Sequence, residues 1–386
     1  MTAEQELLRA TVADLLNEHC TAERVAAASG DSWDAARWQT LWQALESTGL
    51  TLVGTPEEAG GSGGDLAAAA DIAVAAGAAA APVPLAETLA AGMVLARAGV
   101  DIPSGPLTLA VAADPDVALR RVPYGRWGTT VAVGLDRDDT DPDTGAPDSG
   151  APVFGTRVLG TGVVGTGGGG EWLAVASRPA RVQAGRNLAG EPRDEVELGA
   201  EAEFRPVPAG TADYTRSLLR LFRSLLIAGA AQRALDLTVA YVNEREQFGR
   251  PLARFPVVQQ EIARMAGEVA LITAATQAAI AAGPDAGTGA GTGGGTGTAT
   301  AGGGAMSAVL AAKAQASHGA GTVAAIAHQL HGAIGTTEEH RLRLTTTRLW
   351  SWRDEDGPAA ECFTELGRAA LGAAHRGGGL WPWLTG

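Results

Sequence analysis

Two long stretches of helical periodicity in the second half of the chain constrain the fold most strongly. From Thr211 to Val242, apolar residues recur at steps of three and four, the pattern of one buried helix face. The same pattern resumes over about 256–281. Between the two stretches, Gly249 supplies a helix stop and Pro251 supports a new start. Two long helices joined by so short a turn pack antiparallel, so we expect a helical bundle.

A third helical stretch, about 306–332, follows a tract of very different composition. Residues 283–304 are almost wholly Gly, Thr and Ala and contain no large apolar side chain to bury, so we expect a disordered insertion. Its glycines do not form a phosphate-binding loop, because no Lys-Ser/Thr pair follows them and no strand precedes them. We expect residues 209–386 to form one C-terminal domain, an antiparallel four-helix bundle that carries this insertion.

The first half divides into a helical part and a part rich in short strands. Residues 1–103 carry helical periodicity at about 3–20, 38–49, 66–80 and 85–95. Residues 104–208 form short alternating segments cut by Gly, Pro and Asp, which is typical of strands and turns. The clearest strands are Leu107–Ala112, Thr129–Val133 and Trp172–Ala176, and Asp136–Gly150 is expected to be an exposed loop. The sequence thus predicts a mainly α fold: an N-terminal helical domain, a small central β domain and the C-terminal bundle.

Composition and charge argue against several classes of function. The 386-residue chain has a formal net charge of -14, whereas a nucleic-acid site needs a clustered positive field. Cys20 and Cys362 are far apart, so neither a disulfide framework nor a thiolate zinc site is expected. The acidic N-terminus lacks a signal-peptide pattern, and the most apolar run, 67–81, contains Asp71 and little Leu or Ile. We expect a cytoplasmic protein without a membrane span.

The turn between the two long helices contains side chains that packing does not require. Arg245 and Gln247 precede the turn glycine, and Phe248 stands directly before it. The planar fork of an Arg suits pyrophosphate oxygens, a Gln can pair with phosphate or adenine edges, and a Phe offers an apolar wall. The alternative is that Arg245 caps its helix and pairs with a carboxylate.

Three segments along the chain carry a resemblance to one known family. They are Pro56-Glu-Glu-Ala-Gly-Gly-Ser-Gly-Gly64, the run from Ala231-Gln-Arg-Ala-Leu-Asp236 through Tyr241 to Arg245-Glu-Gln-Phe-Gly249, and His328-Gln-Leu-His-Gly-Ala-Ile-Gly-Thr-Thr-Glu-Glu-His340. In this order, on a helix–strand–helix plan, they resemble the acyl-CoA dehydrogenases. The resemblance implies an acyl-CoA dehydrogenase-like fold over nearly the full length of the chain.

The resemblance also implies which residues bind a cofactor. Arg245, Gln247 and Phe248 are similar to a family turn that binds the pyrophosphate and adenine end of FAD across a subunit interface. Gln329, Gly332 and Gly335 lie in the third segment, where missing side chains let backbone N–H groups approach a phosphate. The alternative for these glycines is a turn between helices.

A reaction and its partners follow from the same resemblance. Family members desaturate the α,β bond of an acyl thioester, on coenzyme A or a carrier protein, and use an electron-transfer flavoprotein or similar acceptor. They assemble as homotetramers, or as heterotetramers in which one type of subunit has lost part of the flavin site. Divided enzymes of this kind resemble those that act on bulky acyl chains, including sterol side chains, in actinobacteria. We expect a subunit of such a homo- or heterotetramer in lipid metabolism.

The family segment that holds the flavin ring is missing from this chain. That segment resembles Thr-Glu-Pro-X-X-Gly-Ser-Asp, and nothing between Pro103 and Pro208 matches it. The corresponding stretch is Leu107–Asp116, which ends in Ala-Asp-Pro-Asp. We therefore expect this chain alone to hold the flavin weakly or only by its ADP end.

Desaturation also needs a carboxylate beside the substrate Cα to remove a proton while hydride leaves Cβ. By resemblance, one family position for this base falls on Leu219, which cannot act. The other falls at Asp356, with Glu355 as the second candidate. The alternative is that Asp356 or the following Gly caps a helix opened by Pro358. Arg220 aligns with a family Arg near the thioester and coenzyme A, or is a solvated helix residue.

Two other functions stay open at this point. One is a catalytically silent structural or regulatory partner that binds no flavin, and the other is a flavin oxidase or N-hydroxylase of the same superfamily. His331 and His340 have no carboxylate or Cys at ligand spacing, so we expect packing or surface residues and no metal. The C-terminal tryptophans are expected to seal the bundle or a subunit interface: Trp350, Trp352, Trp381 and Trp383.

Overall fold

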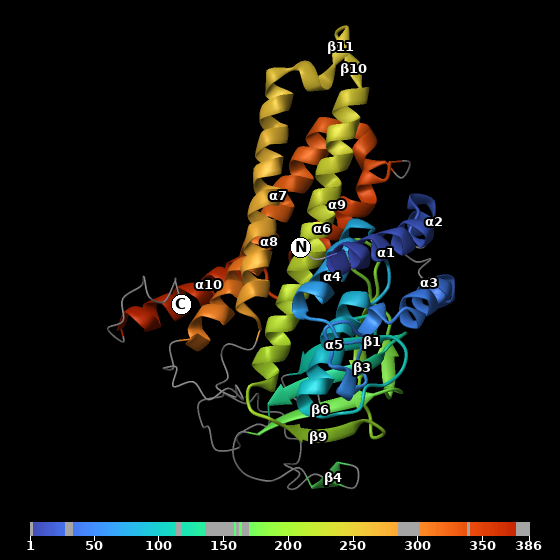
Figure 1. Ribbon diagram of the computed structural model, residues 1–386, viewed down its shortest axis with the longest axis vertical. Coiled ribbons are helices and arrows are strands. Elements are labelled where there is room, and N and C mark those ends of the chain that lie inside the picture. Colours follow the sequence, from blue (N-terminus) through green and yellow to red (C-terminus); the bar gives the residue numbers. More distant parts are fainter. Residues whose placement is uncertain are drawn as a thin grey trace, which may run out of the picture.

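One long central helix organises this computed structural model, which describes residues 3–27, 34–112, 118–135, 158–159, 162–163, 170–284, 301–337 and 340–375. That helix, α6 (Thr211–Glu244), runs from the sheet domain to the far tip of the molecule (Figure 1). The expected loop at Asp136–Gly150, residues 285–300 of the expected insertion, and Trp381 and Trp383 lie outside the described residues.

Five helices precede the sheets and cover one side of α6. They are α1 (Ala3–His19), α2 (Ala22–Ala27), α3 (Ala35–Ser47), α4 (Leu66–Ala78) and α5 (Leu85–Ala98), with short 3-10 turns at Leu50–Leu52 and Glu57–Ala59. Asp34 and Asp65 begin α3 and α4 by accepting hydrogen bonds from Ala36 N and Ala68 N. The sequence predicted the four longer helices and missed α2, whose six residues contain a single buried apolar side chain, Val25.

Small residues bring α4 and α6 into close contact. A Cβ atom on Gly229 of α6 would collide with the carbonyl oxygen of Val74, and one on Gly77 of α4 would collide with the carbonyl oxygen of Leu226. The two helices can therefore approach at backbone distance only because neither position has a side chain. This crossing joins the N-terminal helices to the C-terminal bundle through one continuous hydrophobic core.

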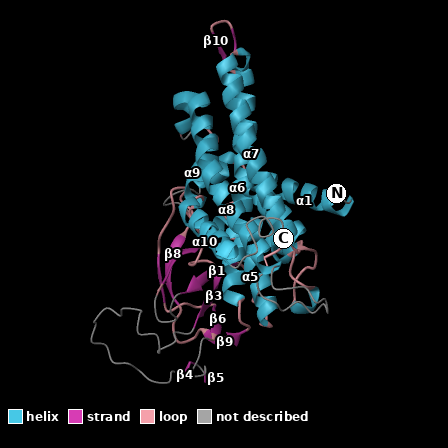
Figure 2. Ribbon diagram, turned by 90° about the vertical axis from the view of Figure 1, so that its left-hand side faces the viewer, coloured by secondary structure: helices cyan, strands magenta, loops and turns pink. Residues whose placement is uncertain are grey.

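The described part of the central domain contains two small sheets and the separate β4-β5 strand pair (Figure 2). The larger has the order β1-β3-β6-β9, with β1 and β3 parallel and the other pairs antiparallel. The smaller has the order β2-β8-β7 and is antiparallel. The three strands predicted from the alternation are present, as β1, β3 and β6. The strand bounds are β1 (Leu107–Ala112), β2 (Leu119–Pro123), β3 (Thr129–Leu135), β4 (Val158–Leu159), β5 (Gly162–Val163), β6 (Glu171–Ala176), β7 (Arg181–Gln183), β8 (Arg193–Glu197) and β9 (Glu203–Val207).

Helices α7 to α10 complete the bundle around α6. They are α7 (Pro256–Ala282), α8 (Ala301–His331), α9 (Leu342–Trp352) and α10 (Ala359–His375), with 3-10 turns at Leu252–Arg254 and Gly332–Thr336. Helix α8 begins at Ala301, so residues 301–304 belong to a helix and not to the expected insertion. Extending an existing helix adds one hydrogen bond per residue fixed, which offsets the weak helix preference of the glycines there.

Both α6 and α7 are long and apolar enough to cross a membrane by length and composition. Most of the apolar stretch of α6 is buried in the core. Most of α7 is exposed, and Val257 and Leu271 have 63% and 55% of their surface accessible. The mainly α fold with a central sheet domain matches the sequence prediction, whereas the domain boundaries at 103 and 208 stay predictions.

Candidate flavin and acyl thioester sites

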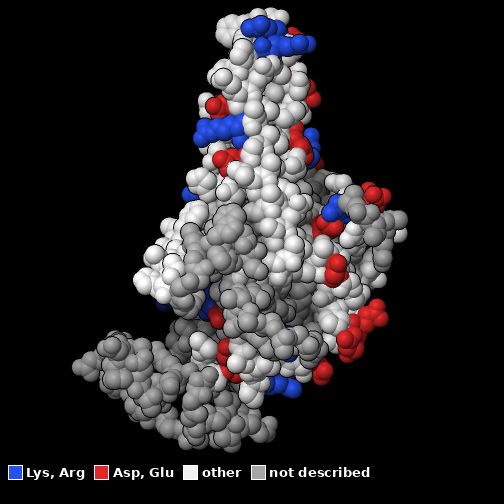
Figure 3. Space-filling view, turned by 60° about the vertical axis from the view of Figure 1, so that its left-hand side comes forward, with Lys and Arg blue, Asp and Glu red and all other residues white. Residues whose placement is uncertain are grey.

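The turn singled out in the sequence is a β-hairpin at the tip of the molecule. Strands β10 (Glu246–Gln247) and β11 (Arg250–Pro251) are joined by Phe248 and Gly249, whose φ angles are 53° and 79°. Two successive left-handed residues give the turn whose twist matches a two-residue hairpin. Phe248 is 90% exposed, and Arg245 and Gln247 are exposed as well. Figure 3 shows basic side chains gathered at this tip, where the chain carries Arg245, Arg250 and Arg254.

The alternative for Arg245 is that it caps its helix and pairs with a carboxylate, and only the first part holds. Its backbone ends α6 with an N–H bond to Tyr241 O, but among the described residues its guanidinium makes no ion pair with a carboxylate. The guanidinium is therefore free to meet an anion from outside the chain. Arg250 behaves differently, because its guanidinium lies 4.2 Å from the centre of the Phe255 ring and stiffens the hairpin.

A ring stack connects this hairpin to the second predicted cofactor segment. Tyr241, one turn before the hairpin, stacks on His331 with ring centres 4.3 Å apart, and its hydroxyl donates to His331 O at 3.3 Å. His331 lies between Gln329 and Gly332, both exposed at the end of α8. The stack thus holds the two predicted segments on neighbouring helix ends.

The glycines of the second segment differ from each other. Gly332 has φ 66° and open space where a Cβ would stand, which suits close approach of a ligand to the backbone there. Gly335 is buried, and a Cβ there would lie 2.8 Å from His331 Cβ, so packing explains it. His340 contacts His331 edge-to-face at 4.8 Å, which makes both histidines packing residues. Within the described ranges, no three His, Cys, Asp or Glu side chains cluster as metal ligands would.

Glu355, one of the two candidate bases, lies in a buried ion cluster. Arg193 donates to both of its oxygens at 2.9 Å, and Arg223 lies 3.3 Å from Oε2. Burial alone would raise the pKa of Glu355, but Arg193 and Arg223 outweigh it and lower the pKa to about 2. A carboxylate so enclosed and so weakly basic is a structural ion pair, which argues against Glu355 as a base.

Asp356, the other candidate, stands at the edge of that cluster. Its side chain is 22% exposed and its Oδ2 accepts from Arg223 Nε at 2.8 Å. Within the described part of the chain, Asp356 makes no hydrogen bond to an N–H of α10, so it does not cap that helix as the alternative required. With φ of 55° at Asp356 and 103° at Gly357, the backbone forms a left-handed turn between α9 and α10.

The loop that carries Asp356 is anchored from two sides. Arg223 of α6 holds Asp356 itself, and the ammonium of Lys313 on α8 donates to Arg353 O at 3.1 Å. Burial lowers the pKa of Lys313 to about 8. The position of Asp356 is therefore fixed by two buried cations from different helices.

Asp356 opens into a cleft between the sheets and α6, which we call the Asp356 cleft. Its volume is about 270 Å³. Its lining combines residues of β1, β2, α6 and the start of α10: Leu109, Ala110, Val111, Arg120, Arg121, Val122, Pro123, Arg216, Leu219, Arg220, Asp356, Gly357 and Glu361. Leu219, the helix position where a base could not act, thus faces the same cleft as Asp356. Arg220 is held by α10, with bonds of 2.8 and 2.6 Å to Glu365, so it is not a solvated helix residue. It lines the cleft, and its Nε has no hydrogen-bond partner in the described structure, so its role toward a substrate stays a prediction.

Sequence reasoning missed Arg120 and Arg121 at the rim of this cleft. The register between β2 and β8 shifts between Leu119 and Val122, and Arg121 has φ 57°. This bulge exposes two successive arginines, and neither makes an ion pair within the described residues. The sequence signal for this bulge is the Arg-Arg pair inside a short strand. Regular alternation of side chains would point one of these two arginines into the core, which a bulge avoids.

Comparison with known proteins identifies the family of the chain. The N-terminal domain model of the acyl-CoA dehydrogenases matches residues 2–101, and their C-terminal domain model matches residues 212–353. Acyl-CoA dehydrogenase IpdE2 of Mycobacterium tuberculosis is 31% identical over 351 residues, covering 88% of this chain and 89% of the relative. The chain belongs to the acyl-CoA dehydrogenase family.

Further acyl-CoA dehydrogenases share its sequence or its fold. IpdE2 of Mycolicibacterium smegmatis is 29% identical over 95% of this chain and 98% of the relative. The ChsE4-ChsE5 complex from Mycobacterium tuberculosis has a TM-score of 0.73 at 20% identity, over 95% of this chain and 97% of that one. Butyryl-CoA dehydrogenase from Megasphaera elsdenii has a TM-score of 0.69 at 16% identity, and the match covers 96% of this chain and 99% of that one.

Acyl-CoA dehydrogenases are flavoproteins, and the residues of this chain fit FAD unevenly. The exposed Arg245, Gln247 and Phe248, with the open backbone at Gly332, fit the pyrophosphate and adenine end. The Asp356 cleft, at about 270 Å³, is at the lower limit of pockets that enclose a drug-sized ligand, roughly 300–1,000 Å³. The described residues of this chain therefore enclose only part of the space that a flavin ring beside an acyl thioester needs.

Proposed function

We propose that this chain is one subunit of a heteromeric, FAD-dependent acyl-CoA dehydrogenase that desaturates an acyl thioester. The hairpin carries this proposal: its Arg245, Gln247 and Phe248 are exposed at the tip of the molecule, remote from the chain's own sheets (Figure 1). Side chains placed there serve a ligand held largely by another subunit. The small Asp356 cleft and the missing ring-binding segment support a site whose other half belongs to a partner.

Asp356 is the side chain we assign to proton abstraction from the substrate Cα. It reaches the cleft, and Arg223 binds only Oδ2, which leaves Oδ1 without a hydrogen bond in the described structure. A bound flavin supplies the acceptor for the hydride that leaves Cβ. Arg223 keeps the carboxylate oriented, and Leu219 and β1 form an apolar wall for the acyl chain.

The substrate we infer is a thioester of a phosphate-bearing carrier, either coenzyme A or a phosphopantetheine group. Arg120 and Arg121 stand at the rim of the Asp356 cleft without a carboxylate partner among the described residues, and guanidinium forks suit phosphate. One related structure is a variant of the Tcur3481-Tcur3483 steroid ACAD, which supports a bulky, ring-containing acyl group. We expect a soluble, cytoplasmic tetramer and an electron-transfer flavoprotein or similar acceptor.

The assignment of Asp356 is tested by replacing it in the complex with its partner. Asp356→Asn should lower kcat by at least about 100-fold, the lower end of what a positioned general base contributes. Asp354→Asn is the matched control, since that carboxylate is two residues away and 57% exposed. If Asp356→Asn keeps full activity in a folded, flavin-loaded complex, the base lies on the partner.

A catalytically silent partner is the second candidate, and the Asp356–Arg223 pair favours it. Arg223 holds Oδ2 of Asp356 at 2.8 Å, so this carboxylate also has a structural role in the loop between α9 and α10. In a silent subunit, both Asp356→Asn and changes at the cleft rim would leave turnover intact, while hairpin substitutions would still reduce flavin binding. The same set of variants therefore separates the two candidates.

A further inference from the structure

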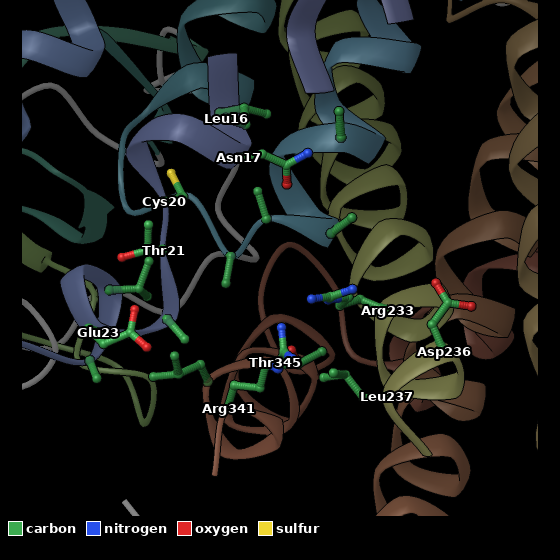
Figure 4. Close-up of a pocket in the computed structure, with 18 of the residues that line it drawn as sticks. Leu16, Asn17, Cys20, Thr21, Glu23, Arg233, Asp236, Leu237, Arg341 and Thr345 are labelled. Atoms are coloured by element: carbon green, nitrogen blue, oxygen red, sulfur yellow. The ribbon is translucent and has the colours of Figure 1, made fainter. Parts of the chain in front are cut away.

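A separate cavity of the described structure lies between the N-terminal helices and the bundle, and it borders the second predicted cofactor segment at His340. Its volume is about 970 Å³, and it shares no lining residue with the Asp356 cleft. It is enclosed by the end of α1, α2, the end of α4, the middle of α6 and the start of α9 (Figure 4). Nothing in the proposed desaturation uses this cavity.

Two arginines extend toward the cavity without a carboxylate partner. Arg233 comes from α6 and Arg341 from the turn before α9, and both point toward the same space (Figure 4). Neither guanidinium makes a hydrogen bond or an ion pair within the described part of the chain. The two guanidinium groups also affect each other: burial lowers the pKa of Arg233, and the positive charge of Arg341 lowers it further.

Two carboxylates also line the cavity, and each acts on one arginine without forming an ion pair. Hydrogen bonds of Glu23, with a smaller effect of Arg341, lower the pKa of Glu23. Asp236 opposes the lowering of the Arg233 pKa. Asp236 accepts a hydrogen bond from Gln232 at 2.8 Å, and Glu23 is exposed on α2. Neither lies within 4.0 Å of a guanidinium nitrogen of Arg233 or Arg341, the limit for an ion pair. Two like charges beside a partly enclosed space are unfavourable unless an anion joins them.

The remaining walls fit an organic molecule better than a bare ion. Leu16, Val25, Leu237 and Leu344 and several alanines provide apolar surface, and Asn17, Thr21 and Thr345 provide hydrogen-bonding groups. A cavity of about 970 Å³ is within the range of sites for small molecules and cofactors. A nucleotide offers the matching parts: a flat apolar base, sugar hydroxyls and a charged phosphate.

We propose that this cavity binds an organic phosphate of nucleotide size, with its phosphate between Arg233 and Arg341. The forks of the two guanidinium groups match phosphate oxygens in geometry and charge. The ligand connects α1 and α2 to α6 and α9, so its binding stabilises the attachment of the N-terminal helices to the bundle. Free nucleotides and the nucleotide end of coenzyme A share this chemistry.

Binding is measured by calorimetry and by thermal unfolding of the full-length chain with ADP, coenzyme A, inorganic pyrophosphate or adenosine. We expect ADP or coenzyme A to bind and raise Tm, adenosine to have no effect, and pyrophosphate to bind at least about 10-fold more weakly because it leaves the apolar walls unfilled. Absence of binding by ADP and coenzyme A overturns the proposal. Pyrophosphate binding as tight as both overturns it as well.

Substitutions place the ligand in this cavity and not at the hairpin. Arg341→Gln, at an exposed position that should not impair folding, is expected to weaken binding by about 10-fold or more, as is Arg233→Gln. Arg24→Gln is the matched control, because Arg24 is an exposed arginine of α2 outside the lining.

Arg245→Ala, in the hairpin, should leave the binding of ADP or coenzyme A unchanged. Loss of binding in Arg245→Ala, with retention in Arg341→Gln and Arg233→Gln, assigns the phosphate to the flavin half-site and overturns the proposal.

Discussion

Glu355 and Asp356 are adjacent carboxylates in opposite environments, and burial separates their roles. Glu355 is 7% exposed and satisfied by Arg193, Arg223 and Asn187, whereas Asp356 reaches the cleft. The sequence placed a candidate base in this loop and named Asp356 before Glu355, but it could not show that Glu355 is buried in an ion cluster. Their difference arises from Arg193 and Asn187, which are 162 and 168 residues away from Glu355 and have no local pattern in common with it.

Glu355→Gln should destabilise the protein by roughly 3–5 kcal/mol, because it leaves Arg193 and Arg223 buried with one fewer counter-charge. Urea unfolding at pH 7 measures the loss, with the exposed Asp354→Asn as the control that stays near wild type. A loss below about 1 kcal/mol would contradict the buried ion cluster.

The loss of unfolding free energy in Glu355→Gln should also depend on pH. The pKa of Glu355 is lowered from 4.5 to about 2, so its stabilisation is complete above pH 4.5 and is lost as pH falls toward 2. Wild type and Glu355→Gln should therefore converge in unfolding free energy between pH 4.5 and 2.5. A gap that stays constant across this window would show that Glu355 titrates normally.

At the scale of elements, the long helices were predictable and the irregular pieces were not. Periodicity over α6, α7 and α8 is strong because each helix buries one face along many turns. The six-residue α2 has too few turns to show a period, and the start of α8 in Ala and Gly carries no apolar pattern. The Arg120–Arg121 bulge arises from pairing between β2 and β8, which lie far apart in sequence.

The crossing of α4 and α6 should tolerate no side chain at Gly229. Gly229→Ala forces backbone of the two helices apart, and we expect a loss of about 1–3 kcal/mol in unfolding free energy. Gly267→Ala is the control on α7, where a Cβ meets nothing within 4 Å and should stabilise the helix by up to about 1 kcal/mol. Equal effects of the two substitutions would contradict the close crossing.

The hairpin should matter for flavin binding and not for the stability of the single chain. Arg245→Ala removes an exposed side chain without a partner among the described residues, so the Tm of the isolated chain should change little. In the complex with its partner, we expect FAD affinity to fall by about 10-fold or more, since a charged hydrogen-bonding group is lost. Arg264→Ala on α7, 64% exposed, is the control. Unchanged FAD affinity in Arg245→Ala would remove the hairpin from the site.

For the whole molecule, the exposed apolar side of α7 and the projecting hairpin are surfaces that we expect to contact a partner subunit. Val257, Leu271 and Phe248 are large apolar side chains with more than half of their surface exposed. Exposed apolar surface of this kind marks an interaction site in many proteins. An acyl-CoA dehydrogenase subunit with half a flavin site is complete only when such a surface meets a partner.

The central claim is that this chain holds half of a flavin site, and its flavin content measures that directly. The chain should be purified alone and after co-expression with a homologous acyl-CoA dehydrogenase subunit, and the FAD absorbance per protein compared. We expect the chain alone to be colourless and the complex to carry FAD that an acyl thioester bleaches. A yellow single chain with one FAD per protomer, bleached by acyl-CoA, would contradict the divided site.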